Sequence, residues 1–118
     1  MKYALLIYAD EAIENAMTEE EQGAMYQEYF AFSEAQRTSG AMLGGEALQP
    51  VATATTVSVR DGKTITVDGP FAETKEQLGG FYLLEVENLD DAIEAAARIP
   101  GARSGRVEIR PLIDFDDM

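Results

Sequence analysis

The stretch GFYLLEVENLDDAIEAAARIPGARSGRVEIR, residues 80–110, combines a strand, a helix and a second strand. Its first part, residues 80–86, contains a continuous apolar run, which is typical of a strand covered on both faces. Asn88 can cap a following helix, and Pro100-Gly101 can end it. Residues 106–113 then alternate between charged and apolar side chains, as a half-buried strand does. The stretch therefore predicts a β-α-β unit.

The N-terminal part of the chain predicts a second β-α-β unit. Residues 3–8 are apolar without alternation, which favours a central strand. A threonine–glutamate capping box opens a helix over residues 19–38. Residues 41–48 predict another strand, in which Gly44-Gly45 indicates a bulge or a close backbone approach. The apolar stripes expected on the two helices are Met25, Tyr26, Tyr29, Phe30, Phe32 and Gln36 in the first, and Leu89, Ala92, Ile93, Ala96 and Ala97 in the second.

A hairpin is expected between the two units. The β-rich residues 55–60 and 63–67 flank Asp61-Gly62, a dipeptide that strongly favours a two-residue hairpin turn. We expect this hairpin to be rich in Thr on one face and in Val and Ile on the other. The predicted fold class is α+β, a ferredoxin-like βαββαβ sandwich with an inserted hairpin, and residues 1–118 are expected to form one domain.

The two central strands predict a partner. With both helices on one face of the sheet, residues 3–8 and 81–84 would leave apolar side chains on the other face. A bare apolar sheet face is a strong reason to associate. We therefore expect a homodimer whose sheets meet face to face.

Missing residue types exclude several kinds of site. The chain has no cysteine, so disulfides, thiolate metal sites and thiol nucleophiles are excluded. It has no histidine, which excludes Ser-His-Asp catalytic triads and metal sites with histidine ligands. Any catalysis must use carboxylates, Lys, Tyr, Arg or backbone groups. An all-oxygen metal site remains allowed, but no motif predicts a metal ion or a cofactor.

The charge of the chain excludes some partners. Twenty-two acidic residues against nine basic ones give a net charge of −13, which repels nucleic acids and anionic membranes. Solubility explains the acidity best, and a basic protein partner is the alternative. The N-terminal apolar run ends at Asp10, too soon for a signal-peptide core or a membrane span, so we expect a cytoplasmic protein.

Residues 67–82, VDGPFAETKEQLGGFY, carry the most distinctive motif. The run Asp68-Gly69-Pro70-Phe71, with the glycine pair before Phe81, resembles the signature of DGPF-domain proteins in the YCII-related superfamily. Residues 2–8, 44–50 and 106–111 resemble that family as well, so the resemblance covers nearly the whole chain.

The resemblance implies a dimeric α/β barrel of ferredoxin-like subunits. It also implies a regulatory or accessory role, because many DGPF proteins are similar to proteins encoded beside extracytoplasmic-function sigma factors. Better-understood YCII relatives use a His-Asp pair in a cleft, in at least one case for dehalogenating lyase chemistry. That mechanism does not carry over to a chain without histidine. Only the acidic position of the motif has a counterpart here, in Asp68 or Glu73.

Asp68 has two interpretations. Its carboxylate can accept hydrogen bonds from backbone N–H groups and so fix the turn, or it can act as a base at the mouth of a pocket. Glu73, the second candidate base, could share the face of a helical turn with Glu76. The candidate ligand-binding residues are Tyr8, Glu46, Phe71, Lys75 and Tyr82.

Three functions are compatible with these residues. The leading hypothesis is a small-molecule-binding protein that is accessory to a sigma-factor-linked stress response. The first alternative is a carboxylate-dependent, histidine-free lyase or hydrolase acting on a small organic substrate. The second alternative is an acidic protein-interaction module.

Overall fold

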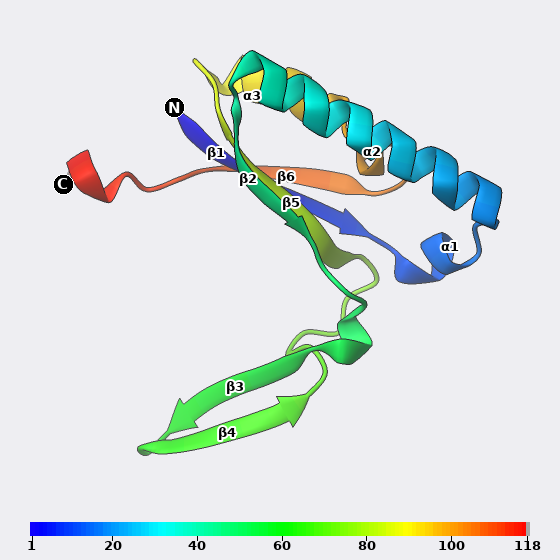
Figure 1. The fold of residues 1–118 in the computed structure, drawn as a ribbon. Coiled ribbons are helices and arrows are strands. Elements are labelled where there is room, and N and C mark those ends of the chain that lie inside the picture. Colours follow the sequence, from blue (N-terminus) through cyan, green and yellow to red (C-terminus); the bar gives the residue numbers. More distant parts are fainter. Residues whose placement is uncertain (118) are drawn as a thin grey trace.

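The computed structural model describes residues 1–117, and Met118 lies outside this range (Figure 1). The elements, in chain order, are β1 (Lys2–Ala9), α1 (Glu11–Asn15), α2 (Glu19–Ser39), β2 (Met42–Ala47), the 3-10 turn η1 (Val51–Thr53), β3 (Thr55–Arg60), β4 (Lys63–Asp68), β5 (Gln77–Glu85), α3 (Leu89–Ala97), α4 (Gly101–Ser104), β6 (Arg106–Pro111) and η2 (Phe115–Asp117). The predicted order, two β-α-β units separated by a hairpin, is confirmed.

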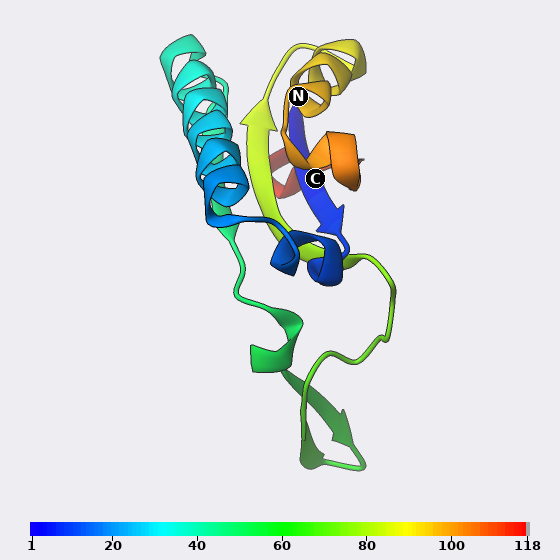
Figure 2. The same cartoon turned by 90° about the vertical axis from the view of Figure 1, so that its right-hand side faces the viewer.

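Four strands form one antiparallel sheet in the order β2-β5-β1-β6. Together with the two helices, this order matches the ferredoxin-like α+β arrangement. Helices α2 and α3 lie side by side on the same face of the sheet (Figure 2). The sheet is open, and residues 1–117 form no closed barrel.

The core lies between this sheet and the two helices. Tyr3, Leu5 and Ile7 of β1 pack with Leu84 of β5 and Phe32 of α2, and α3 adds three buried alanines, Ala92, Ala95 and Ala96. Small side chains let α3 approach the sheet closely, so its buried face is narrower than expected.

The predicted helix stripes were therefore too wide. Tyr26 and Phe30 of α2 are 72% and 67% exposed, because only a narrow stripe around Phe32 meets the sheet. On α3, the buried face is centred on alanines, and it leaves Leu89 and Ile93 about half exposed. Apolar side chains at helical spacing predicted the right side of each helix but not the width of its contact.

Two glycine pairs shape the strands as their positions suggested. A Cβ on Gly45 would lie 2.8 Å from the carbonyl oxygen of Phe81, so β2 and β5 approach closely only because residue 45 has none. A register shift between Met42 and Gly44 adds the predicted bulge in β2. Strand β5 begins earlier than expected, at Gln77, and its glycine pair lies at a second shift in the pairing with β1.

Strands β3 and β4 form a separate two-stranded sheet, here called the arm (residues 55–68), which extends away from the body (Figures 1 and 2). The two-residue turn pairs Val57 with Thr66 and Ser58 with Ile65. Directly opposed residues share a face, so each face carries one aliphatic row and one hydroxyl row. The expected division into a Thr face and a Val/Ile face was wrong.

Candidate functional site

The sheet face opposite the helices, here called the open sheet face, has an apolar centre and charged edges. Ala4 and Leu6 of β1 lie beside Leu83 and Phe81 of β5, and all four are buried or half-buried. Glu46 stands next to Phe81 on the β2 edge. On the β6 edge, the residues that alternate onto this face are Arg106, Glu108 and Arg110.

A hollow of about 450 Å³ lies at one corner of this face, where β1 ends and β6 begins. Tyr8 and Arg106 are direct partners across the two strands, so their side chains enter the hollow from neighbouring positions. The segment before β5 forms the remaining wall. The lining residues of this Tyr8 hollow are Tyr8, Thr74, Glu76, Arg106, Val107 and Glu108.

Polar contacts position the wall of the hollow. The Thr74 hydroxyl donates to the backbone carbonyl oxygen of Glu76 at 2.6 Å. The side-chain amide of Gln77 donates to the backbone carbonyl oxygen of Thr74 at 2.8 Å. The Glu76 carboxylate lies 3.2 Å from Nε of Arg106. Because the Arg106 side chain is 82% exposed, this ion pair contributes little stability. An anionic group on a ligand could therefore replace Glu76 at small cost.

The hollow can recognise both signs of charge. Arg106 and the Tyr8 hydroxyl can donate hydrogen bonds to a ligand, while the Thr74 hydroxyl, which already donates to Glu76, can only accept. The carboxylates of Glu76 and Glu108 can also only accept when ionised. Glu108 also pairs with Arg110, its neighbour along the open sheet face, at 3.3 Å. This set suits a small polar molecule that carries an acidic group and a donor group.

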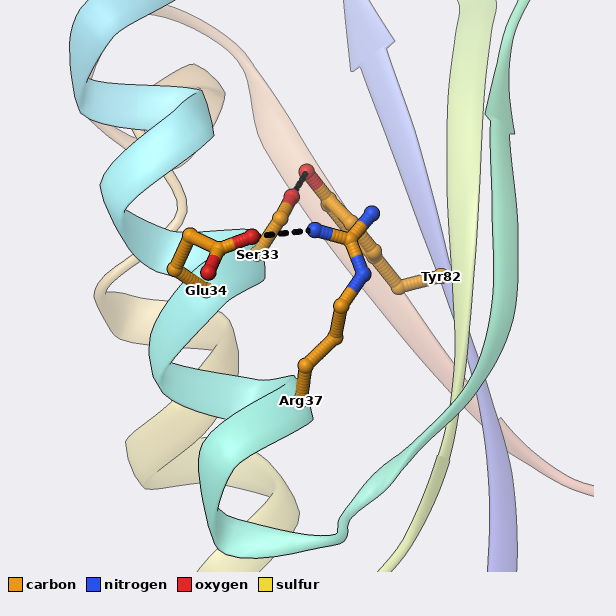
Figure 3. Close-up of polar contacts among 4 residues, drawn as sticks. All are labelled: Ser33, Glu34, Arg37 and Tyr82. Atoms are coloured by element: carbon orange, nitrogen blue, oxygen red, sulfur yellow. Dashed lines mark hydrogen bonds and ion pairs between the residues drawn. The ribbon is translucent and has the colours of Figure 1, made fainter.

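Of the residues predicted from sequence, Tyr8 lines the hollow. Glu46 lies on the same sheet face but at the opposite edge, where it pairs directly with Phe81 on the neighbouring strand. Tyr82 projects to the helix side of the sheet, where its hydroxyl lies 3.1 Å from that of Ser33 (Figure 3). Its ring also packs against Phe32, with 5.0 Å between ring centroids. The structure therefore does not bring Tyr82 to the hollow.

The other four predicted residues are exposed and lie outside the lining of the hollow. Asp68 ends β4, and Phe71, Glu73 and Lys75 lie in the segment between β4 and β5. Phe71 is 88% exposed. No helical turn forms over this segment, so the shared face expected for Glu73 and Glu76 was wrong, and Glu76 instead turns toward Arg106.

The turn after β4 depends on Gly69 rather than on the Asp68 carboxylate. Gly69 donates its backbone N–H to the carbonyl of Ala54 at 2.7 Å and accepts a 2.7 Å hydrogen bond from the Thr56 hydroxyl. Its φ of 96° lies in the region that favours glycine. Within residues 1–117, the Asp68 carboxylate accepts no hydrogen bond. The interpretation in which it fixes the turn by accepting from backbone N–H groups is therefore wrong.

Sequence analysis missed Arg106, Thr74 and Glu108. From sequence, Arg106 and Glu108 were identified only as charged positions of a half-buried strand. The available signal was their alternation: both share a sheet face with Leu6 and Tyr8 if β6 pairs with β1. Thr74 carried no signal, because an irregular segment positions it.

Other possible sites are absent or lie elsewhere. Partial desolvation, with the charge of Glu11, raises the pKa of the Glu14 carboxyl on α1, which is not part of the hollow. Residues 1–117 contain no group of three or more acidic side chains arranged to hold a metal ion. In the same range, no helix is long and apolar enough to cross a membrane.

Comparison with known proteins identifies the family of this chain. The model of the YCII-related domain matches residues 1–116. The chain belongs to the YCII-related family. A relative from Rhizobium meliloti (strain 1021), described as an uncharacterised protein, is 39% identical over 114 residues, which are 95% of this chain and 92% of that protein. The family resemblance seen in residues 67–82 is thus supported along nearly the whole chain.

Proposed function

We propose that this YCII-related protein is a cytoplasmic homodimer that binds a small polar organic molecule in the Tyr8 hollow. The observation that carries this proposal is the position of the hollow. It lies at the corner of the open sheet face, beside the uncovered apolar side chains of Leu6 and Phe81. A second subunit on that face would cover the hollow and turn it into an enclosed site.

The surface area of the chain supports the dimer. One chain of 12.9 kDa exposes 8539 Å², whereas a compact monomer of that mass exposes about 6,300 Å². The excess, about 2,200 Å² per chain, is within the range that obligate homodimers bury. The radius of gyration, 16.3 Å, likewise exceeds the roughly 13.5 Å of a compact domain of this length.

The charges at the edges of the open sheet face support face-to-face association. Arg106 and Arg110 lie on the β6 edge, and Glu46 lies on the β2 edge. In a two-fold dimer, the same patch meets itself in opposite orientation. The basic edge of one copy can then lie near the acidic edge of the other. Two such sheets would together form the dimeric α/β barrel that the family resemblance implies.

The ligand should carry an acidic group for Arg106 and a hydrogen-bond donor for Glu76 or Glu108. The net charge of −13 makes binding of large anions unfavourable, which favours a small molecule with groups of both signs. Such binding suits an accessory role in a stress-response circuit. Catalysis by Asp68 or Glu73 has weaker support, because both side chains are exposed outside the hollow.

A ligand screen by NMR tests the proposal. Pools of small amino, hydroxy and phosphorylated acids are added to ¹⁵N-labelled protein, and shifts are expected in the amides of Tyr8, Thr74 and Arg106. Arg106→Gln should weaken the binding at least tenfold. Arg98→Gln, which removes an exposed ion pair with Glu94 on α3, is the matched control and should bind normally. A second, smaller depression lies between α2 and α3 and is lined by residues that include Gln36 and Ala95. Shifts confined to this depression would contradict the proposed site.

A further inference from the structure

Within residues 1–117, the side chains of the arm are left largely uncovered by the rest of the chain. Every residue of β4 is exposed, and in β3 only Thr56 and Ser58 are half-buried. Val57, Val59 and Val67 are each more than half exposed, and Ile65 is 42% exposed. The arm thus presents an aliphatic row on each of its two faces, Val57 with Val59 on one and Ile65 with Val67 on the other.

An arm of this kind is unstable in isolation. A two-stranded hairpin without a covered face is marginally stable in water. Both of its strands are edges, and exposed apolar edges tend to associate with other chains. The η1 turn that precedes the arm is tied to the body, because the Glu11 carboxylate accepts a hydrogen bond from the backbone N–H of Val51 at 3.0 Å. The arm therefore leaves the body next to this contact, with its aliphatic rows uncovered.

The position and the charge of the arm indicate which molecule covers its aliphatic rows. The arm extends to the side of the sheet away from α2 and α3, which is the side of the open sheet face (Figure 1). Its tip carries Arg60 and Lys63 around Asp61, which makes the tip a basic point in a chain with a net charge of −13. A second copy of this chain supplies both an acidic surface for the tip and the area that the excess of about 2,200 Å² requires.

We propose that the arm docks on a second copy of this chain and buries one of its two aliphatic rows there. The arm and the open sheet face then hold the same partner from two sides. Since two-fold symmetry makes the contact reciprocal, each subunit is held by the arm of the other. This inference rests on the proposed homodimer, but it makes a separate claim about the arm.

Threonine substitutions in each row test the claim. Val57→Thr with Val59→Thr alters one face, and Ile65→Thr with Val67→Thr alters the other. Threonine keeps the branched Cβ and the strand propensity of these residues. It replaces a methyl group with a hydroxyl at each Val, and the larger ethyl group with a hydroxyl at Ile65. Because each substitution occurs twice in a dimer, we expect one of these two variants to weaken dimerisation by roughly 100-fold or more, measured by sedimentation equilibrium. Ile93→Thr, at a half-exposed position on α3, is the control and should leave the dimer dissociation constant unchanged.

Hydrogen exchange separates the two claims. In the wild-type dimer, the amides of residues 55–68 should be protected, and the monomeric variant Leu6→Glu should lose this protection while its core amides stay protected. A stable wild-type dimer in which the arm exchanges as fast as in the monomer, with neither threonine variant weakened, would overturn the arm contact and leave the homodimer intact. A wild-type protein that stays monomeric would overturn both.

Discussion

Gly105 lies where the start of β6 meets the end of β1, at the edge of the Tyr8 hollow. A Cβ at residue 105 would lie 2.1 Å from the carbonyl oxygen of Tyr8 and 3.1 Å from Cα of Ala9. Both are backbone atoms, so no side-chain rotation can relieve the contact. Gly105→Ala must push the two strands apart where Tyr8 pairs with Arg106. Overpacking of this kind costs about 1–3 kcal/mol, and a lost strand hydrogen bond adds about 1 kcal/mol.

We therefore expect Gly105→Ala to lower the free energy of unfolding by about 2–4 kcal/mol. The assay is equilibrium unfolding in urea at one fixed protein concentration, since the stability of a dimer depends on concentration. Gly23→Ala is the matched control. A Cβ there meets no atom within 4 Å, and in the interior of α2 alanine should stabilise by about 1 kcal/mol. A Gly105→Ala protein as stable as wild type would refute the close approach of β1 and β6.

Three further predictions concern single side chains. Tyr29→Phe should cost about 1–3 kcal/mol, because the buried N–H of Gly101 loses the hydroxyl that accepts its 3.1 Å hydrogen bond; Tyr26→Phe, at an exposed position, should cost nothing in the same assay. Asp68→Ala should leave the melting temperature unchanged, because its carboxylate accepts no hydrogen bond within residues 1–117, and a clear fall would restore the structural role. Glu14→Gln should raise the melting temperature at pH 7, because desolvation and Glu11 raise the pKa of the Glu14 carboxyl and so disfavour its charged form in the folded state. That gain should disappear below the ordinary carboxyl pKa, where Glu14 is protonated in both states, and a gain that persists there would contradict the assignment.

Local patterns predicted the elements of this fold well. The capping box at Thr18 and Glu21 forms as expected, and α2 ends one residue beyond the predicted boundary. Asp61-Gly62 makes the predicted hairpin turn. These signals act within a few residues, so no knowledge of the tertiary fold was needed to interpret them.

Features that depend on how two elements meet were predicted less well. The two faces of the arm were misassigned because the register of β3 and β4, not their composition, decides which side chains share a face. Tyr82 was expected at a ligand site, but the strand register directs it toward Ser33 on α2. Arg106 was missed because its place beside Tyr8 depends on β6 pairing with β1. In each case, the deciding fact is which residues of two elements meet, and for Tyr82 and Arg106 those elements lie far apart in the chain.

The mass of the wild-type protein in solution tests the central claim most directly. The apolar centre of the open sheet face and the uncovered arm predict that sedimentation equilibrium will give twice the 12.9 kDa of one chain. They also predict that Leu6→Glu, which places a charge at that centre, will give a single chain. A wild-type mass of one chain across the accessible concentration range would contradict the account, because the Tyr8 hollow would then have no second subunit to enclose it.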